Sequence, residues 1–374
     1  MSSLPNDSNE QSAVKAAAKK IIEDFGLPRI IILSTFILLF ILAGVYGMNL
    51  PAFFGNVLRR WGMFGILVLA MVPSIQSGIG PNFGVTVGIV GGLLGAVLSI
   101  EMNHLGFFDF ITNPALLRVV QALTAIVIGG SVATGMGVLY GMLLNRVKGS
   151  EMAVSVYVGF SAIAIFNILW ARIPVTSGIM ILPATGQGLR QMINLQDDFG
   201  GAFDNLFLVQ IGSFTMHTGL LLVFFLFCFF VWLFTRSRLG MMMSAAGANP
   251  SYATAAGINV EKMRILGTTI STVLGAIGII VYAQSFGFLQ MYNAPLMMGF
   301  TSVAAVLIGG ATVKRARVFD VLLGAFLFNG ILTIALPLAN EIIPDIPGVP
   351  EMLRLIITNG IILYALTKVK VGGR

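Results

Sequence analysis

The chain has 374 residues, a formal net charge of +7 and only 10% charged residues. Hydrophobic residues make up 57% of it, and the mean hydropathy is +0.93. Soluble globular domains carry about 25% charged residues, so this composition excludes a soluble enzyme or binding domain. The basic residues lie beside hydrophobic runs instead of forming one cluster, which excludes a nucleic-acid-binding protein. The composition therefore indicates a polytopic helical membrane protein.

Hydrophobic runs of about 17 residues or more are long enough to cross the apolar layer of a bilayer as helices. Ten runs fit this description: 30–48, 61–77, 83–100, 116–144, 152–170, 218–234, 265–286, 295–311, 319–339 and 351–366. The predicted fold class is all-α, with about ten transmembrane helices. Because only residues 78–82 separate the second and third runs, a re-entrant pair with eight spans in total stays open.

The distribution of lysine and arginine predicts the orientation, since cytoplasmic loops retain these residues. With the amino end inside, 16 of the 22 basic residues fall on the cytoplasmic side. Both tails, 1–29 and 369–374, are then cytoplasmic and flank a transmembrane domain at 30–368. Within this domain, 171–217 form an extracytoplasmic insertion and 236–264 a cytoplasmic loop. The insertion could contact a partner protein, cap the exit of a pathway, or do neither.

The cytoplasmic loop contains the signals of a short helix of about two turns. Asn249 is a favoured N-cap, Pro250 suits the first helical position, and Gly257 suits the C-terminal cap. Tyr252 gives this helix a large side chain to bury. A helix that only connects two spans at the membrane interface remains the alternative to a docking element.

The same loop resembles a known family through three segments at 238–240, 246–249 and 253–260, which read RLG, AGAN and ATAAGINV. They are similar to the signature of permease subunits of bacterial ABC importers of the ribose and simple-sugar type, and the similarity continues through 275–282, 304–310 and 324–330. The resemblance implies a multi-pass protein of the bacterial cytoplasmic (inner) membrane whose short helix couples to a separate ATPase. The coupling residues that it implies are Gly247, Asn249, Ala253, Gly257 and Ile258; Tyr252 is added from the residues themselves.

Family resemblance also implies partners: ABC ATPase subunits, an extracytoplasmic solute-binding protein and a second permease copy. A homodimer is expected, and a heterodimer stays open. The chain has no phosphate-binding loop of the G-x-x-x-x-G-K-[ST] type, so ATP and Mg²⁺ are expected in the ATPase, with no cofactor in this chain. Cys228, His104 and His217 stand singly, so neither a metal site nor a catalytic residue is predicted.

Polar side chains on otherwise apolar spans are candidates for a translocation path, because a buried amide needs a hydrogen-bond partner or a water-filled cavity. The candidates are Gln76, Asn82, Thr86, Asn167, Gln284 and Asn329, together with Phe83 beside a predicted helix break. Interhelical hydrogen bonding is the alternative role for each. Gly80, Pro81 and Gly84 predict the break.

The most favoured solute is a monosaccharide, followed by a nucleoside. Related sugar permeases usually have a segment like GIDLSVG at the break, whereas residues 80–88 read GPNFGVTVG and lack its acidic residue. The identity of the solute therefore stays open. An ion-coupled secondary transporter is the alternative function, although the spans carry few of the ionisable groups that such carriers use.

Overall fold

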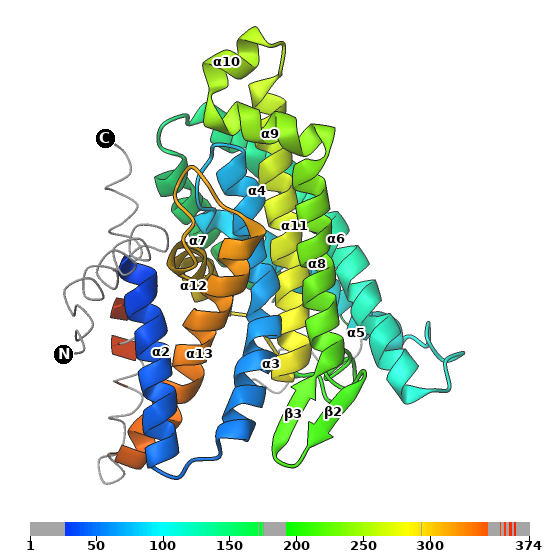
Figure 1. The fold of residues 1–374 in the computed structure, drawn as a ribbon. Helices are drawn as coiled ribbons and strands as arrows, with labels where there is room; N and C mark the ends of the chain where they lie inside the picture. Colours follow the sequence, from blue (N-terminus) through cyan, green and yellow to red (C-terminus); the bar gives the residue numbers. More distant parts are fainter. Residues whose placement is uncertain are drawn as a thin grey trace, which may run out of the picture.

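The computed structural model describes residues 27–170, 192–292 and 294–342, with isolated positions at 172–175 and 352–363. Most of both predicted tails, most of the run at 351–366 and the first part of the insertion lie outside the described residues. Within the described part the chain is predominantly helical, as predicted (Figure 1).

Seven helical segments of the described chain are long and apolar enough to cross a membrane: Leu50–Gln76, Phe83–His104, Pro114–Arg146, Glu151–Trp170, Thr218–Arg236, Val260–Phe286 and Val318–Ile342. Two shorter apolar helices cover Arg29–Val45 and Met297–Ile308. The prediction of a multi-pass helical protein is confirmed, whereas the number of ten spans stays a prediction. Both members of the suspected re-entrant pair are long enough to span alone.

The helices are α2 (Leu27–Val45), α3 (Leu50–Leu69), α4 (Met71–Gln76), η1 (Phe83–Val85), α5 (Thr86–His104), α6 (Pro114–Arg146), α7 (Glu151–Trp170), α8 (Thr218–Arg236), α9 (Arg238–Ala248), α10 (Pro250–Ala255), α11 (Val260–Phe286), α12 (Ala294–Ile308) and α13 (Val318–Ile342). Four short strands accompany them: β1 (Met192–Asn194), β2 (Leu208–Ile211), β3 (Phe214–His217) and β4 (Phe288–Gln290). The strands form two antiparallel pairs, β1 with β4 and β2 with β3. The short strands do not change the class, and the mostly helical architecture agrees with the all-α fold predicted from the sequence.

Helix α11 lies in the middle of the bundle and packs against α3, α5 and α6. Glycine makes this close packing possible, because small residues let helix backbones approach each other closely. A Cβ atom added to Gly88 on α5 would lie 1.9 Å from the carbonyl oxygen of Thr272 on α11. One added to Gly92 would lie 2.4 Å from that of Ala276, so neither position accepts a larger residue without a shift of backbone.

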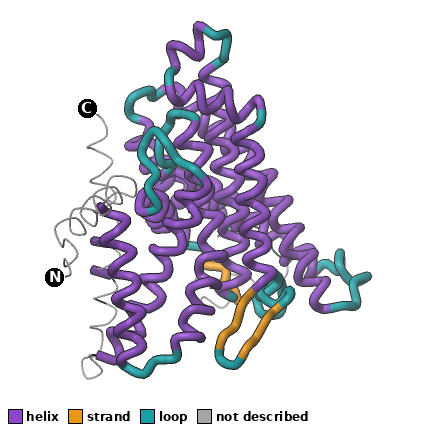
Figure 2. The backbone as a smooth tube through the Cα atoms, in the orientation of Figure 1, coloured by secondary structure: helices purple, strands orange, loops and turns teal. Residues whose placement is uncertain are grey.

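The bundle has two polar ends, which Figure 2 shows as the places where loops and strands gather. Helices α9 and α10 project at one end, here called the α10 end (238–260). The β2–β3 hairpin lies at the opposite end, called the hairpin end (192–217), and α8 and α11 run between the two (Figure 1). The described part of the predicted extracytoplasmic insertion and the predicted cytoplasmic loop thus lie at opposite ends.

The second span begins earlier than predicted, at Leu50 instead of residue 61. Asn49 caps it, with its side-chain Oδ1 accepting a hydrogen bond from the Ala52 amide at 3.2 Å. Arg59 and Arg60 consequently lie within α3 and not in a loop. Arg59 is accommodated there because its guanidinium is paired with the Asp204 carboxylate at 2.8 Å.

Candidate functional site

Helix α10 starts as the sequence predicts. The Oδ1 atom of Asn249 accepts a hydrogen bond from the backbone N–H of Tyr252 at 3.0 Å, and Pro250 occupies the first turn. This cap satisfies one of the N–H groups that a helix start leaves without an internal partner. Residues of the local sequence therefore fix the start of the helix.

The other end of α10 closes with a Schellman motif. Gly257 has a φ of +79°, and its N–H donates to the carbonyl of Thr254 at 3.0 Å. The N–H of Ile258 donates to the carbonyl of Ala253 at 2.9 Å. Only glycine adopts this left-handed conformation without strain, so Gly257 sets the point where the chain turns back to α11.

The face that α10 buries differs from the prediction. Ala253 is fully buried against the chain, whereas Tyr252 is 70% exposed. The Tyr252 ring is thus presented at the surface instead of being buried. Exposed aromatic side chains are enriched at protein–protein interfaces, so this ring is suited to contact a partner protein.

Helix α9 was not foreseen in the sequence, and it connects α10 to the bundle. A Cβ atom on Gly247 would lie 2.2 Å from the carbonyl oxygen of Gln76 and 2.6 Å from the amide nitrogen of Gly78. All these neighbours are backbone atoms that cannot rotate away. The end of α9 therefore rests directly on the chain segment that follows α4.

This segment is the helix break that the sequence predicts. Gly78 and Gly80 have φ values of +81° and +91°, and the Ser74 hydroxyl donates to the carbonyl of Gly80 at 2.8 Å. Asn82 is almost fully buried and joins three elements: its Nδ2 donates to the Ser271 hydroxyl at 2.8 Å, and its Oδ1 accepts from the Tyr140 hydroxyl at 2.9 Å.

Three of the predicted path residues, Asn82, Phe83 and Thr86, lie together at this break. The Thr86 hydroxyl donates to the carbonyl of Pro295 at 3.2 Å. The Phe83 ring lies 5.5 Å from that of Phe300, which lies 6.4 Å from that of Phe160 on α7. Irregular backbone is tolerated in a membrane where it is buried in protein, and these three buried side chains are the predicted path residues that converge.

Three other candidates do not converge with them. Gln76 donates from Nε2 to the carbonyl of Ala316 at 2.9 Å. Asn329 donates to the carbonyl of Ala325 in its own helix at 2.9 Å. The Oδ1 atom of Asn167 is buried without a hydrogen-bond partner among the described residues.

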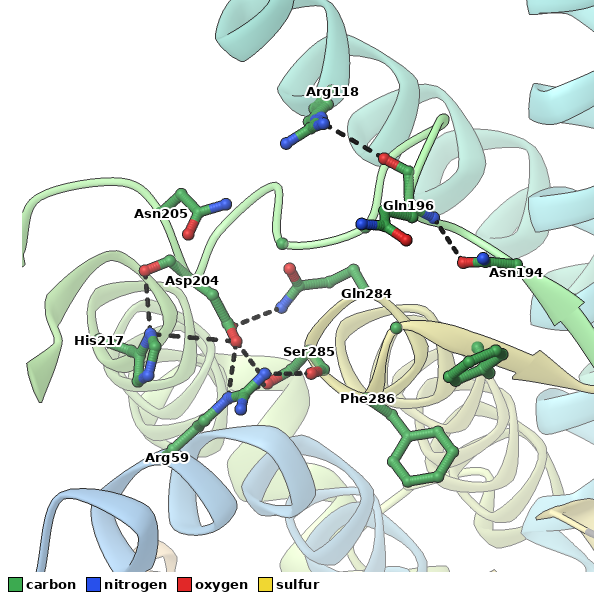
Figure 3. Close-up of a pocket in the computed structure, with 14 residues that line it drawn as sticks. Arg59, Arg118, Asn194, Gln196, Asp204, Asn205, His217, Gln284, Ser285 and Phe286 are labelled. Atoms are coloured by element: carbon green, nitrogen blue, oxygen red, sulfur yellow. Dashed lines mark hydrogen bonds and ion pairs between the residues drawn. The ribbon is translucent and has the colours of Figure 1, made fainter. Parts of the chain in front are cut away.

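Gln284 belongs instead to a buried polar cluster at the hairpin end, centred on Asp204 (Figure 3). Asp204 is 2% exposed. Its Oδ1 accepts from Gln284 Nε2 at 3.2 Å, while its Oδ2 accepts from Arg59 Nε and from the Ser285 hydroxyl, both at 2.8 Å. The cluster joins the insertion to α3 and α11.

A pocket of about 420 Å³ lies beside this cluster. Its polar lining includes Arg118, Asn194, Gln196 and Asn205, which come from α6 and the insertion. Sequence reasoning missed this group because its members are far apart in the chain, and the acidic residues of the insertion were the one available signal. Burial raises the pKa of another of these acids, Asp198, whose carboxylate accepts a hydrogen bond from Asn103.

A multi-pass helical bundle with a polar helix break and a projecting capped helix is compatible with a membrane transport protein. The family model described as "Branched-chain amino acid transport system / permease component" matches residues 53–366, and the chain belongs to this family. No solved structure matches the chain. The resemblance stated from the sequence is thereby confirmed, and the chain is a multi-pass protein of the inner membrane.

Three curated relatives are similar to the chain. The nucleoside ABC transporter permease protein NupB of Lactococcus lactis is 24% identical, over 84% of this chain and 79% of its own length. The galactofuranose transporter permease protein YtfT of Escherichia coli is 26% identical, over 73% of this chain and 82% of its own. The guanosine ABC transporter permease protein NupQ of Bacillus subtilis is 29% identical, over 35% and 39%.

Proposed function

We propose that the chain is the permease subunit of an ATP-driven ABC importer for a sugar or a nucleoside. The observation that carries this proposal is the construction of α10. It is capped at both ends by Asn249 and Gly257, it projects from the bundle, and through α9 it rests on the helix break beside the path residues. An element built in this way transmits the movement of a partner protein at the membrane surface to the helix break.

The proposed mechanism is alternating access driven by a partner. ATP closes the partner ATPase dimer, and α10 moves with the surface on which it docks. Gly247 passes this displacement to the backbone at Gln76 and Gly78, which are held next to it without intervening side chains. The two permeases of the assembly then open toward the hairpin end, where a solute-binding protein delivers the solute. The α10 end is cytoplasmic in this scheme.

The substrate class follows from the relatives and from the chemistry of the path. The relatives are named as nucleoside, guanosine and galactofuranose permeases. A sugar and a nucleoside share a ring with several hydroxyl groups. Thr86 offers a hydroxyl and Phe83, Phe160 and Phe300 offer aromatic rings at the break, which suit the polar edge and the flat face of such a solute.

Changing either cap of α10 to a large charged residue is expected to uncouple the assembled importer. Asn249→Arg removes the side-chain acceptor, and Gly257→Arg places a side chain in a left-handed conformation. We expect both variants to fold and assemble, but solute is expected to leave ATP hydrolysis at its basal rate. ATPase activity of the reconstituted complex, measured with and without solute-loaded binding protein, tests this expectation.

Gly149→Arg is the matched control, because it adds the same charge at another exposed left-handed glycine, in the loop between α6 and α7 and not on α10. It is expected to retain solute-stimulated ATP hydrolysis. Normal stimulation in both cap variants would show that α10 is only a connection between two spans.

A further inference from the structure

We infer that the pocket at the hairpin end is a binding site for the hydroxylated ring of the solute, before it reaches the helix break. The pocket lies at the opposite end from α10, and its volume of about 420 Å³ falls in the range of small-molecule sites, about 300–1,000 Å³. It is separate from the path residues Asn82, Phe83 and Thr86.

Three residues that line the pocket, Asn194, Gln196 and Asn205, each carry an amide, which both donates and accepts hydrogen bonds. A sugar hydroxyl also does both, so these amides match it. The charged Arg59 and Asp204 in the same lining are paired with each other, and Arg118 donates to the Gln196 carbonyl. The side-chain amides of Gln196 and Asn205 have no hydrogen-bond partner among the described residues, and in Figure 3 they lie around the space above Gln284 together with Arg118.

The aromatic side chain of Phe288 lines the same pocket and is 41% exposed. Phe286 also borders the pocket, but its ring stacks on that of Tyr282 at 5.4 Å and points away from the amides in Figure 3. Phe286 and Phe288 flank Gly287, whose φ of +86° ends α11 and turns the chain into β4. An aromatic ring covers the apolar C–H face of a sugar, or stacks on a nucleobase, while amides bind the hydroxyl edge. One exposed ring, strand-paired with Asn194 and close to two further amides, is therefore a fitting set of groups.

The pocket is built on rigid elements. Strand pairing places Asn194 opposite Phe288, and the Leu195 amide donates to the Gly287 carbonyl at 3.0 Å. Within the lining, Asp204 fixes Gln284 and Arg59 by hydrogen bonds. The backbone that carries the amides and the Phe288 ring is consequently held in place before any ligand arrives, which lowers the entropic cost of binding.

The test is binding of small probes to the full-length chain in lipid nanodiscs, measured by saturation-transfer NMR titration. The probes are D-ribose, D-galactose, uridine and guanosine, with L-leucine as a solute without a hydroxylated ring. At least one hydroxylated probe is expected to bind saturably. Asn205→Ala and Phe288→Ala are each expected to weaken this binding about fivefold, the value of one neutral hydrogen bond or a comparable ring contact.

Both side chains are exposed, so these variants are expected to unfold at the same temperature as the unmodified chain. Asn56→Ala is the matched control, because Asn56 is an exposed amide close to Arg59 that does not line this pocket. It is expected to bind the probe normally. Phe288→Tyr, which keeps the ring, is expected to restore the binding that Phe288→Ala loses. Tighter binding of uridine or guanosine than of both free sugars would assign the site to nucleosides, and the reverse to sugars.

The choice of probes rests on the proposed function, but the two fail in different ways. If a hydroxylated probe binds equally to Asn205→Ala, Phe288→Ala and the unmodified chain, the pocket is not the site, while the sugar or nucleoside permease stands. If no hydroxylated probe binds at all, the inference also fails, and solute-stimulated ATP hydrolysis still decides the proposed function. Binding of leucine alone would overturn the proposed substrate class itself.

Discussion

Replacing Asp204 by alanine is expected to lower the free energy of unfolding by about 3 kcal/mol, the lower part of the range for breaking a buried ion pair. The carboxylate accepts hydrogen bonds from Arg59, Gln284 and Ser285, and it is 2% exposed. Without it, the Ser285 hydroxyl loses its acceptor, and Arg59 and Gln284 donate only to Ser285 and to the Val281 carbonyl among the described residues. The Arg59 side chain is 37% exposed, so water solvates part of the unpaired guanidinium charge and limits the loss of stability.

Denaturant-induced unfolding in mixed micelles measures this effect. Asp197→Ala is the matched control, because Asp197 is an exposed carboxylate of the same insertion and its removal is expected to change stability by less than about 0.5 kcal/mol. The double variant Arg59→Met/Asp204→Leu removes both the guanidinium and the carboxylate, so neither charge is left unpaired. This variant is expected to be more stable than Asp204→Ala. Equal stabilities of Asp204→Ala and Asp197→Ala would show that the cluster does not hold the insertion on the bundle.

Replacing Gly247 by leucine is expected to affect both stability and coupling. The new Cβ would lie 2.2 Å from the Gln76 carbonyl oxygen and 2.6 Å from the Gly78 nitrogen. Since both are backbone atoms, α9 must move away from the helix break, at a cost of about 1–3 kcal/mol. The displaced helix no longer transmits the motion of α10. The variant complex is therefore expected to have a lower unfolding temperature and ATP hydrolysis that solute does not stimulate.

Gly135→Leu provides the control for this change, because a Cβ at Gly135 would have no neighbour within 4 Å. It is expected to leave both the unfolding temperature and solute stimulation close to those of the unmodified complex. If Gly247→Leu lowers the unfolding temperature but keeps full solute stimulation, the contact between α9 and the helix break is structural only. The motion of α10 would then reach the helix break by another route.

The sequence predicts the local features of this fold well. The cap at Asn249, the left-handed Gly257 and the break around Gly80 depend on residues that are neighbours in the chain, and the structure confirms each of them. The start of α3 was missed because Arg59 and Arg60 interrupt the hydrophobic run. The capping signal at Asn49 and the proline that follows it were the information that could have corrected this error.

Long-range partners could not be predicted in the same way. Gln284 is a polar residue on an apolar span, but its acceptor Asp204 lies 80 residues away in the insertion. The amide of Asn82 likewise meets Tyr140 and Ser271, which no local pattern connects to it. A polar residue in a span indicates that a partner exists, whereas the identity of that partner depends on how the helices pack.

The central claim is that this chain supplies a path and a lever while a separate ATPase supplies the energy. Solute uptake into proteoliposomes tests it most directly, with the purified chain reconstituted either alone or together with its ATPase and binding protein. We expect uptake only in the complete assembly with ATP, and none by the chain alone under an imposed sodium or proton gradient. Uptake by the chain alone, driven by either gradient, would contradict the account and establish an ion-coupled carrier.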